Sequence, residues 1–210
     1  MASLFFYMGR HPTLYSRLCR EIRQAFSSVD EIHNGPALNN CTYLRACIQE
    51  SLRMSPPVGG ALWREICQGG VSIDGHMIPQ GYDVGVGIYA VQHNPSYYPD
   101  PFAFKPERWI SGPSVSQESI NLAHSAFSAF SIGPVGCVGK NLAYLELSLT
   151  MANVAWSLEI KTMTTQETHR PNYLANYAQH AEYEYRLRDR FTSWKDNLHL
   201  SFQVHESHDS

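Results

Sequence analysis

Apolar residues recur at helical spacing near the start of the chain. Within residues 12–27 they fall four positions apart and line one face of an amphipathic helix, at Leu14, Leu18, Ile22 and Phe26. A second helix is predicted from about residue 40 to residue 54. Asn39 or Asn40 would cap it and Pro56-Pro57 would stop it.

Two further stretches also predict helices, and several short apolar stretches predict strands. The apolar run from Leu142 to about Ser157 indicates a helix, and residues 3–9 indicate the end of another. Glycine-containing turns separate short strands that we expect near residues 61–66, 71–73 and 82–86. After the helix at 142–157, short strands alternate with loops and are expected near residues 183–188 and 198–204. The chain should therefore be mainly α with small β-sheets, an α+β fold.

The remaining segments are predicted to be irregular. They are a loop at 34–36, a segment rich in proline and aromatic residues at 93–109, a polar loop at about 110–128 and a disordered tail at 205–210. No internal repeat or domain linker interrupts the pattern. Residues 1–210 are therefore expected to form a single domain.

Composition narrows the possible functions. With 43% apolar residues the chain can bury a sizeable core, and a net charge of −3 makes nucleic acid an unsuitable partner. The five cysteines are odd in number, widely spread and without a Cys-x-x-Cys pair; they are Cys19, Cys41, Cys47, Cys67 and Cys137. This pattern argues against a disulfide framework and a structural zinc site, and it suits a reducing compartment. The ten histidines form no recognisable metal motif.

The N-terminus offers little for membrane insertion. Residues 1–8 are apolar, but they are too short for a membrane span and lack the basic leader of a signal peptide. No other window reaches membrane length. The sequence therefore predicts no signal or transmembrane segment.

The stretch Phe130-Ser-Ile-Gly-Pro-Val-Gly-Cys-Val-Gly139 holds the strongest candidate for chemistry. It sets Cys137 in a glycine-punctuated loop just before the predicted helix at 142–157. A helix N-terminus favours a thiolate, and glycines let backbone amides approach the sulfur. Such a thiolate is a suitable axial ligand for haem iron, and Phe130 and the glycines would let a flat macrocycle lie against the loop.

At these residues the chain resembles the cytochrome P450 family of haem-thiolate monooxygenases, whose loop reads Phe-x-x-Gly-x-Arg-x-Cys-x-Gly. Phe130, Gly133, Cys137 and Gly139 match, and residues 139–143 continue as in many members. Val135 replaces the family's usual arginine. The resemblance implies the C-terminal, haem-proximal portion of the family's fold. It also implies haem b as cofactor, with Cys137 as axial ligand of the iron.

Two charged motifs precede the cysteine in the order that the family shows. Glu50 and Arg53 lie three residues apart on a predicted helix, which by itself indicates only an exposed ion pair. Pro106-Glu-Arg-Trp109 adds Arg108. The resemblance implies that Glu50, Arg53 and Arg108 form a buried structural cluster that braces the cysteine loop.

Further assignments follow from the same resemblance. Arg64 corresponds to an arginine that pairs with a haem propionate, although a solvated strand arginine is an equal alternative. Residues 58–62 and the turn 191–194 correspond to segments that line the substrate pocket. Their apolar character suits a small apolar substrate and equally suits ordinary core. The amino-acid sequences of the motifs are most similar to those of fungal members that act in secondary metabolism.

The implied reaction inserts one oxygen atom from O2 into the substrate, with electrons from an NADPH-dependent reductase. Full-length relatives are typically bound to the endoplasmic-reticulum membrane by an anchor that we expect to be absent here. The resemblance covers less than half of the family's catalytic domain and excludes the helix that delivers protons to bound dioxygen. A non-catalytic haem-binding or degenerate remnant is therefore the alternative, and an unrelated metal or thiol enzyme using Cys137 is a third.

Overall fold

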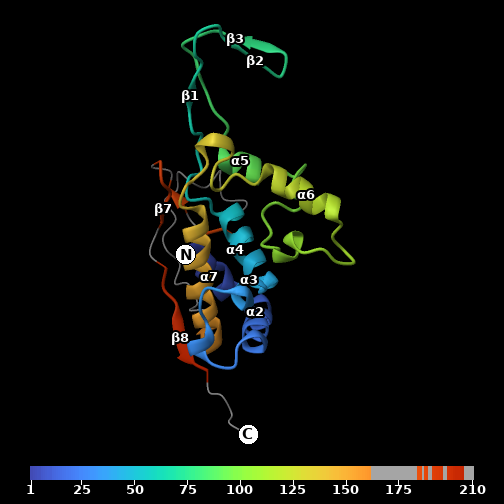
Figure 1. Cartoon of the computed structure of the whole chain (residues 1–210), viewed down its shortest axis with the longest axis vertical. Coiled ribbons are helices and arrows are strands. Elements are labelled where there is room, and N and C mark those ends of the chain that lie inside the picture. The colour runs from blue at the N-terminus through green and yellow to red at the C-terminus, as the bar shows by residue number, and fades with distance from the viewer. Residues whose placement is uncertain (162–183, 186, 189–190, 196–197, 206–210) are drawn as a thin grey trace, which may run out of the picture.

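The structure is a computed structural model that describes residues 1–161, 184–185, 187–188, 191–195 and 198–205. Helices dominate these residues (Figure 1). The α-helices are α1 (Ala2–Arg10), α2 (Pro12–Ala25), α3 (Pro36–Asn39), α4 (Thr42–Met54), α5 (Ile88–Gln92), α6 (Gln117–Ala126) and α7 (Lys140–Ser157). Three 3-10 turns accompany them: η1 (Val29–Glu31), η2 (Pro106–Trp109) and η3 (Gly133–Val135).

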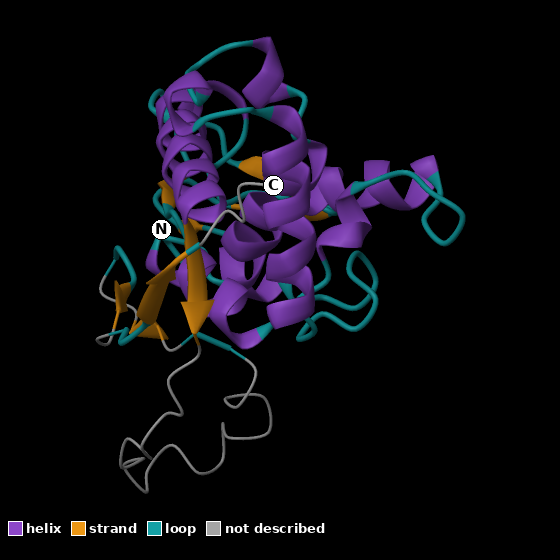
Figure 2. Ribbon diagram, turned by 90° about the horizontal axis from the view of Figure 1, so that it is seen from below, coloured by secondary structure: helices purple, strands orange, loops and turns teal. Residues whose placement is uncertain are grey.

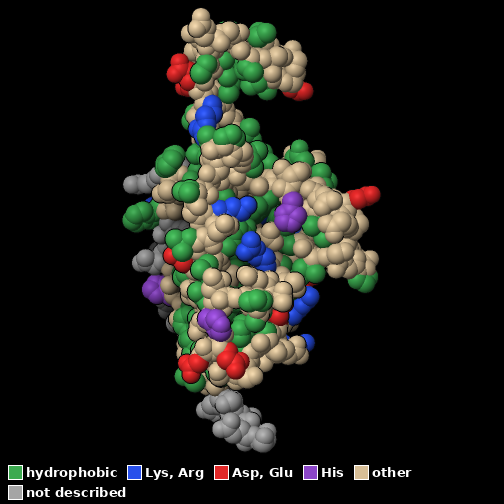
Figure 3. Space-filling model, viewed as in Figure 1, with side chains coloured by type: hydrophobic (Ala, Val, Ile, Leu, Met, Phe, Trp, Pro, Cys, Tyr) green, Lys and Arg blue, Asp and Glu red, His purple; other side chains and the backbone are tan. Residues whose placement is uncertain are grey.

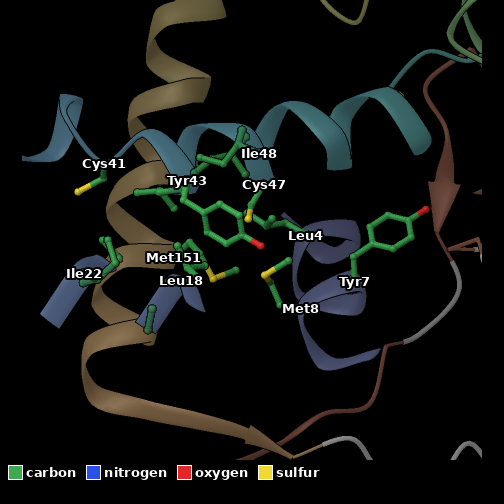
Figure 4. Packing of buried hydrophobic residues seen from close by; sticks show 14 of the residues in the cluster. Leu4, Tyr7, Met8, Leu18, Ile22, Cys41, Tyr43, Cys47, Ile48 and Met151 are labelled. Carbon is green, nitrogen blue, oxygen red and sulfur yellow. The ribbon is translucent and has the colours of Figure 1, made fainter. Parts of the chain in front are cut away.

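The main hydrophobic core lies between α1, α2, α4 and α7. Figure 4 shows Leu4 and Met8 of α1 facing Tyr43 and Cys47 of α4, with Met151 of α7 beside them. The predicted apolar face of α2 is confirmed, because Leu18, Ile22 and Phe26 are buried and Leu14 packs against the same cluster. The four helices thus form the layer on which the candidate site is built.

The predicted cap of α4 is wrong. The helix begins after Cys41, which makes no side-chain capping bond. Instead, the carboxylate of Glu21 on α2 accepts hydrogen bonds from the backbone N–H groups of Tyr43 and Leu44, each at 2.8 Å. These groups have no partner within the helix. A tertiary contact from a residue more than twenty positions away thus replaces the local cap.

The strands are short and pair antiparallel in twos. They are β1 (Arg64–Glu65) with β4 (Asp83–Val84), β2 (Val71–Ile73) with β3 (His76–Ile78), β5 (Leu158–Lys161) with β8 (Ser201–Val204), and β6 (Leu187–Arg188) with β7 (Trp194–Lys195). The β2–β3 hairpin projects from the helical body in Figure 1. The β5–β8 pair runs along one side of the helices (Figure 2). The α+β prediction is confirmed, although β3, β5 and β7 were not predicted.

The polar loop predicted at 110–128 is wrong, because it contains α6. The Ser116 hydroxyl caps this helix by accepting from the N–H of Ser119 at 3.1 Å. Its buried face consists of Ile120, Ala123 and Ala126. Only one of these three is large and apolar, so the helical pattern is faint in the sequence.

Two other expectations concern the ends of the chain. None of the helices in the described ranges combines the length and apolar character that a membrane crossing needs. The disordered tail predicted at 205–210 lies outside the described residues except for His205, whose N–H donates to the carbonyl of Ser157 at 2.9 Å.

Candidate functional site

Glu50 and Arg53 lie at the centre of a buried charged cluster. Both side chains are fully buried in α4, and Arg53 donates to both carboxylate oxygens of Glu50, each at 2.9 Å. Arg108 in η2 donates from its Nε to Oε1 of Glu50, also at 2.9 Å. A planar guanidinium that donates two parallel bonds is held in a fixed orientation. The structure therefore brings together three residues that the sequence separates by up to 58 positions.

Two donors that the sequence analysis missed complete this cluster. The backbone N–H of Lys105 donates to Oε1 of Glu50, and the indole Nε1 of Trp109 donates to Oε2, each at 2.9 Å. Trp109 directly follows Arg108, so the motif at 106–109 already contained the residue that supplies the indole donor. The Glu50 carboxylate accepts five hydrogen bonds from residues in the described part of the chain.

The charge state of Glu50 follows from its neighbours. Burial by itself would raise the pKa of this carboxyl, but the guanidinium groups of Arg53 and Arg108 outweigh burial and hold the pKa below its ordinary value. Glu50 is therefore an ionised acceptor for the two arginines. A fully buried, fully paired carboxylate of this kind organises the backbone around it and is not exposed to a substrate.

Cys137 lies in a short loop that leads into α7. Its backbone N–H donates to the carbonyl of Phe130 at 2.8 Å, and its carbonyl accepts from the N–H of Lys140 at 3.2 Å. The thiol itself is exposed. The loop therefore holds the backbone of Cys137 from both sides and leaves the sulfur accessible at the start of a helix.

The two matched glycines of the loop, Gly133 and Gly139, occupy different surroundings. Gly133 has a φ of +68°, and a Cβ added there would meet no atom within 4 Å. A Cβ at Gly139 would lie 3.8 Å from the sulfur of Cys137. Phe130 packs against Tyr144 of α7, with ring centroids 5.2 Å apart. Glycine at position 139 thus leaves the surface next to the sulfur free of a side chain, and glycine at position 133 allows the left-handed backbone of the loop.

Apolar side chains are unusually exposed along the same loop. Ile132, Val135 and Val138 expose 67%, 56% and 104% of their reference areas, and Leu142 at the start of α7 exposes 59%. A cluster of exposed apolar residues commonly marks a surface that contacts a ligand or another protein. The accessible sulfur of Cys137 thus lies in an apolar loop.

Comparison with known proteins gives the family. A family model described as Cytochrome P450 matches residues 1–182. The chain belongs to the cytochrome P450 family. The cytochrome P450 monooxygenase apf8 of Gibberella fujikuroi is 55% identical over 155 residues, which are 73% of this chain and 42% of the relative.

Two other cytochrome P450 monooxygenases match nearly the whole chain. The protein poxM of Penicillium oxalicum is 42% identical over 203 residues, 97% of this chain and 36% of the relative. The protein lcsN of Purpureocillium lilacinum is 40% identical over 204 residues, 96% of this chain and 58% of the relative. The chain thus spans less than half the length of two of these relatives. Membership in the family confirms the resemblance and the partial cytochrome P450 fold.

The residues of this P450 loop fit a haem. The donor is one accessible thiol, Gly139 leaves open space beside it, and exposed side chains of the same loop are apolar. A macrocycle that is flat and largely apolar requires such a surface. Arg64, the predicted propionate partner, is exposed on β1 and donates to the carbonyl of its neighbour Trp63 at 2.8 Å. Its role toward a propionate stays a prediction.

The two segments predicted to line the substrate pocket lie together. Ser193 donates from its N–H to the carbonyl of Pro57 at 2.7 Å and from its hydroxyl to the carbonyl of Pro56 at 3.0 Å. The turn at 191–194 is therefore fixed to the two prolines that directly precede the segment 58–62. Phe191 in this turn is 71% exposed and has a φ of +68°, a strained value for a large side chain.

A cavity of about 420 Å³ lies elsewhere, between α3, α7 and the beginning of α4. Its lining residues are Asn34, Leu38, Asn39, Arg45, Asn141, Leu142, Tyr144, Leu145 and Ser148. None of them belongs to the segment 58–62 or the turn 191–194. This cavity is therefore distinct from the predicted substrate-lining surface.

Proposed function

We propose that this chain is the haem-proximal portion of a cytochrome P450 monooxygenase, with Cys137 as the axial ligand of the haem iron. The observation that supports this most is the accessible sulfur of Cys137 in a glycine-lined, apolar loop at the start of α7. Family membership favours the same reading. Secondary metabolism is proposed as its setting, in keeping with the fungal relatives.

In this proposal the residues of the chain hold and orient the cofactor. Cys137 supplies the sulfur, Phe130 and Gly133 form part of the surface under the ring, and Gly139 leaves room beside the sulfur. The N-terminus of α7 favours the thiolate over the thiol. Thiolate-ligated haem, when bound, supplies the activation of dioxygen that leads to insertion of one oxygen atom into the substrate.

The remaining predicted residues have supporting roles in this proposal. Glu50, Arg53 and Arg108 hold the segment 103–109 against the end of α4, which fixes the backbone behind the loop. Arg64 would pair with a propionate. The segment 58–62 and the turn 191–194 would contact a small apolar substrate.

Electrons would come from an NADPH-dependent reductase. Figure 3 shows Lys and Arg side chains near the middle of the face that carries α4 and α7, with Asp and Glu side chains toward its margins. A positive face attracts a partner with an acidic surface and speeds the encounter. An endoplasmic-reticulum location stays a prediction from the family resemblance.

Expression with a haem supply tests the proposal. Reduced protein exposed to carbon monoxide should give the red-shifted Soret band of thiolate-ligated haem, and Cys137→Ser should abolish it. Cys67→Ser is the matched control, because Cys67 is also an exposed free cysteine and should leave the band unchanged. Absence of haem uptake by the wild-type chain would overturn the proposal.

Two further measurements refine this result. Turnover with a reductase and NADPH distinguishes a monooxygenase from a non-catalytic haem binder. Val135→Arg restores the arginine that the family usually has at this position, and the 56% exposure of Val135 leaves room for the longer side chain. We expect this variant to retain haem longer than the wild type during gel filtration.

A further inference from the structure

Gln92 is a fully buried amide at the end of α5 that makes three hydrogen bonds to two separate segments. Its Nε2 donates to the carbonyls of Leu52 and Arg53, at 3.2 and 2.9 Å. These carbonyls belong to the last turn of α4 and have no partner within the helix. Its Oε1 accepts from the backbone N–H of Ser128 at 3.1 Å. One side chain therefore closes the end of α4 and holds the chain just before the cysteine loop.

The same residue is tied to the charged cluster through its backbone. The carbonyl of Gln92 accepts from Nη1 of Arg53 at 2.8 Å, and Arg53 is fixed by both oxygens of Glu50. The position of the Gln92 backbone is thus set by the cluster. Its side chain then connects the cluster to Ser128.

Ser128 is the first anchored residue of the cysteine loop. Its carbonyl accepts from the N–H of Ser131 at 2.8 Å, which forms a tight turn with Ser131 at a φ of +58°. The carbonyl of Phe130, inside this turn, accepts from the N–H of Cys137 at 2.8 Å. The backbone contacts of Cys137 therefore depend on the position of a turn that begins at Ser128.

We propose that Gln92 is a positioning residue, which transmits the fixed geometry of the Glu50–Arg53–Arg108 cluster to the loop that carries Cys137. Only an amide of this length can donate to α4 carbonyls at one end and accept from the Ser128 N–H at the other. Its importance for haem binding rests on the role proposed above for Cys137, whereas the anchoring of the loop does not.

Hydrogen exchange on the 210-residue chain tests the anchoring directly. Gln92→Met keeps the length and volume of the side chain but leaves the N–H of Ser128 and two α4 carbonyls unpaired. We expect amide exchange in residues 128–137 to become about tenfold faster, as for the loss of about one buried hydrogen bond. Gln92→Glu keeps the acceptor for Ser128, so its loop should stay closer to wild type, while the last turn of α4 opens in both variants.

Tyr15→Phe is the matched control, because it removes the hydrogen bonds from this hydroxyl to the carbonyls of Leu158 and Val154, at the far end of α7. It should leave residues 128–137 unchanged. If Gln92→Met accelerates exchange there no more than Tyr15→Phe does, the anchoring proposal is wrong. If Gln92→Met does not fold, Gln92→Asn takes its place, because asparagine keeps both polar groups on a shorter side chain. Its exchange in residues 128–137 is then compared with that of Tyr15→Phe in the same way.

The haem-supplied protein gives a separate readout. We expect Gln92→Met to lower the fraction of the thiolate-type Soret band several-fold relative to Tyr15→Phe at equal protein concentration. An unchanged fraction would overturn the proposed importance of Gln92 for haem binding. A wild-type chain that takes up no haem would overturn the proposed function of Cys137, and hydrogen exchange would then decide the anchoring role alone.

Discussion

Replacing Glu50 by glutamine tests the charged cluster most directly. The substitution keeps the shape of the side chain but turns one acceptor oxygen into a donor NH2 group. Oε2 accepts from Arg53 Nε and Trp109 Nε1, and Oε1 accepts from Arg53 Nη2, Lys105 N and Arg108 Nε. In either orientation of the new amide, at least two buried donors therefore lose their acceptor.

The magnitude follows from this count. Each buried donor without a partner costs about 1–3 kcal/mol, and the two guanidinium groups also lose their countercharge. Breaking a buried ion pair by removing one partner typically costs about 3–5 kcal/mol. We therefore expect Glu50→Gln to lower the free energy of unfolding by about 3–5 kcal/mol, a large part of the ~5–15 kcal/mol of a typical domain.

Urea unfolding followed by circular dichroism measures this loss. Glu107→Gln is the matched control, since Glu107 pairs with Arg17 at 2.7 Å but both side chains are almost half exposed. A pair of this kind contributes less than about 1 kcal/mol. If Glu50→Gln costs no more than Glu107→Gln, the buried cluster does not hold this part of the fold together.

Three smaller effects are also expected. Glu21→Ala removes the cap of α4 and should cost about 1–2 kcal/mol in the same urea assay; a cost below that of Glu107→Gln would show that the cap is dispensable. The buried hydroxyl of Tyr43 makes no hydrogen bond to any residue in the described part of the chain. Tyr43→Phe should therefore leave the free energy of unfolding unchanged or raise it by up to about 1 kcal/mol. A clear loss of stability would contradict this. Because the pKa of Glu50 is lowered in the folded chain from an ordinary value of 4.5, its stabilisation is complete above that pH and is lost as the pH falls below it. Glu50→Gln should therefore flatten the acid part of a plot of stability against pH, and an unchanged slope would argue against an ionised Glu50.

The sequence predicted the main helices because their apolar residues are large and regularly spaced. It did not predict α6, because two of the three buried positions in this helix are alanines and its visible character is polar. The cap of α4 could not be predicted from the sequence either. Glu21 lies on another helix, and no local pattern relates it to the N–H groups of Tyr43 and Leu44.

The candidate site shows the same division. Cys137 and its glycines form a contiguous motif, so the sequence alone identifies them. Glu50, Arg53 and Arg108 were associated only through the family resemblance, since neither spacing nor composition relates positions so far apart. Gln92 belongs to no motif. Its position becomes meaningful only when the end of α4 and the start of the cysteine loop are seen side by side.

The long separation within the Glu50 cluster has a consequence for the order of folding. Cys137 closes on Phe130 across seven residues, which costs little loop entropy, whereas Glu50 must wait for partners 55 to 59 residues later in the chain. During synthesis from the N-terminus, α4 therefore leaves the ribosome well before Lys105, Arg108 and Trp109 exist to pair with it. Until then Glu50 has only Arg53 as a partner. The desolvation of the Glu50 carboxylate at the end of α4 can therefore be compensated by all of its partners only after residue 109 has been made.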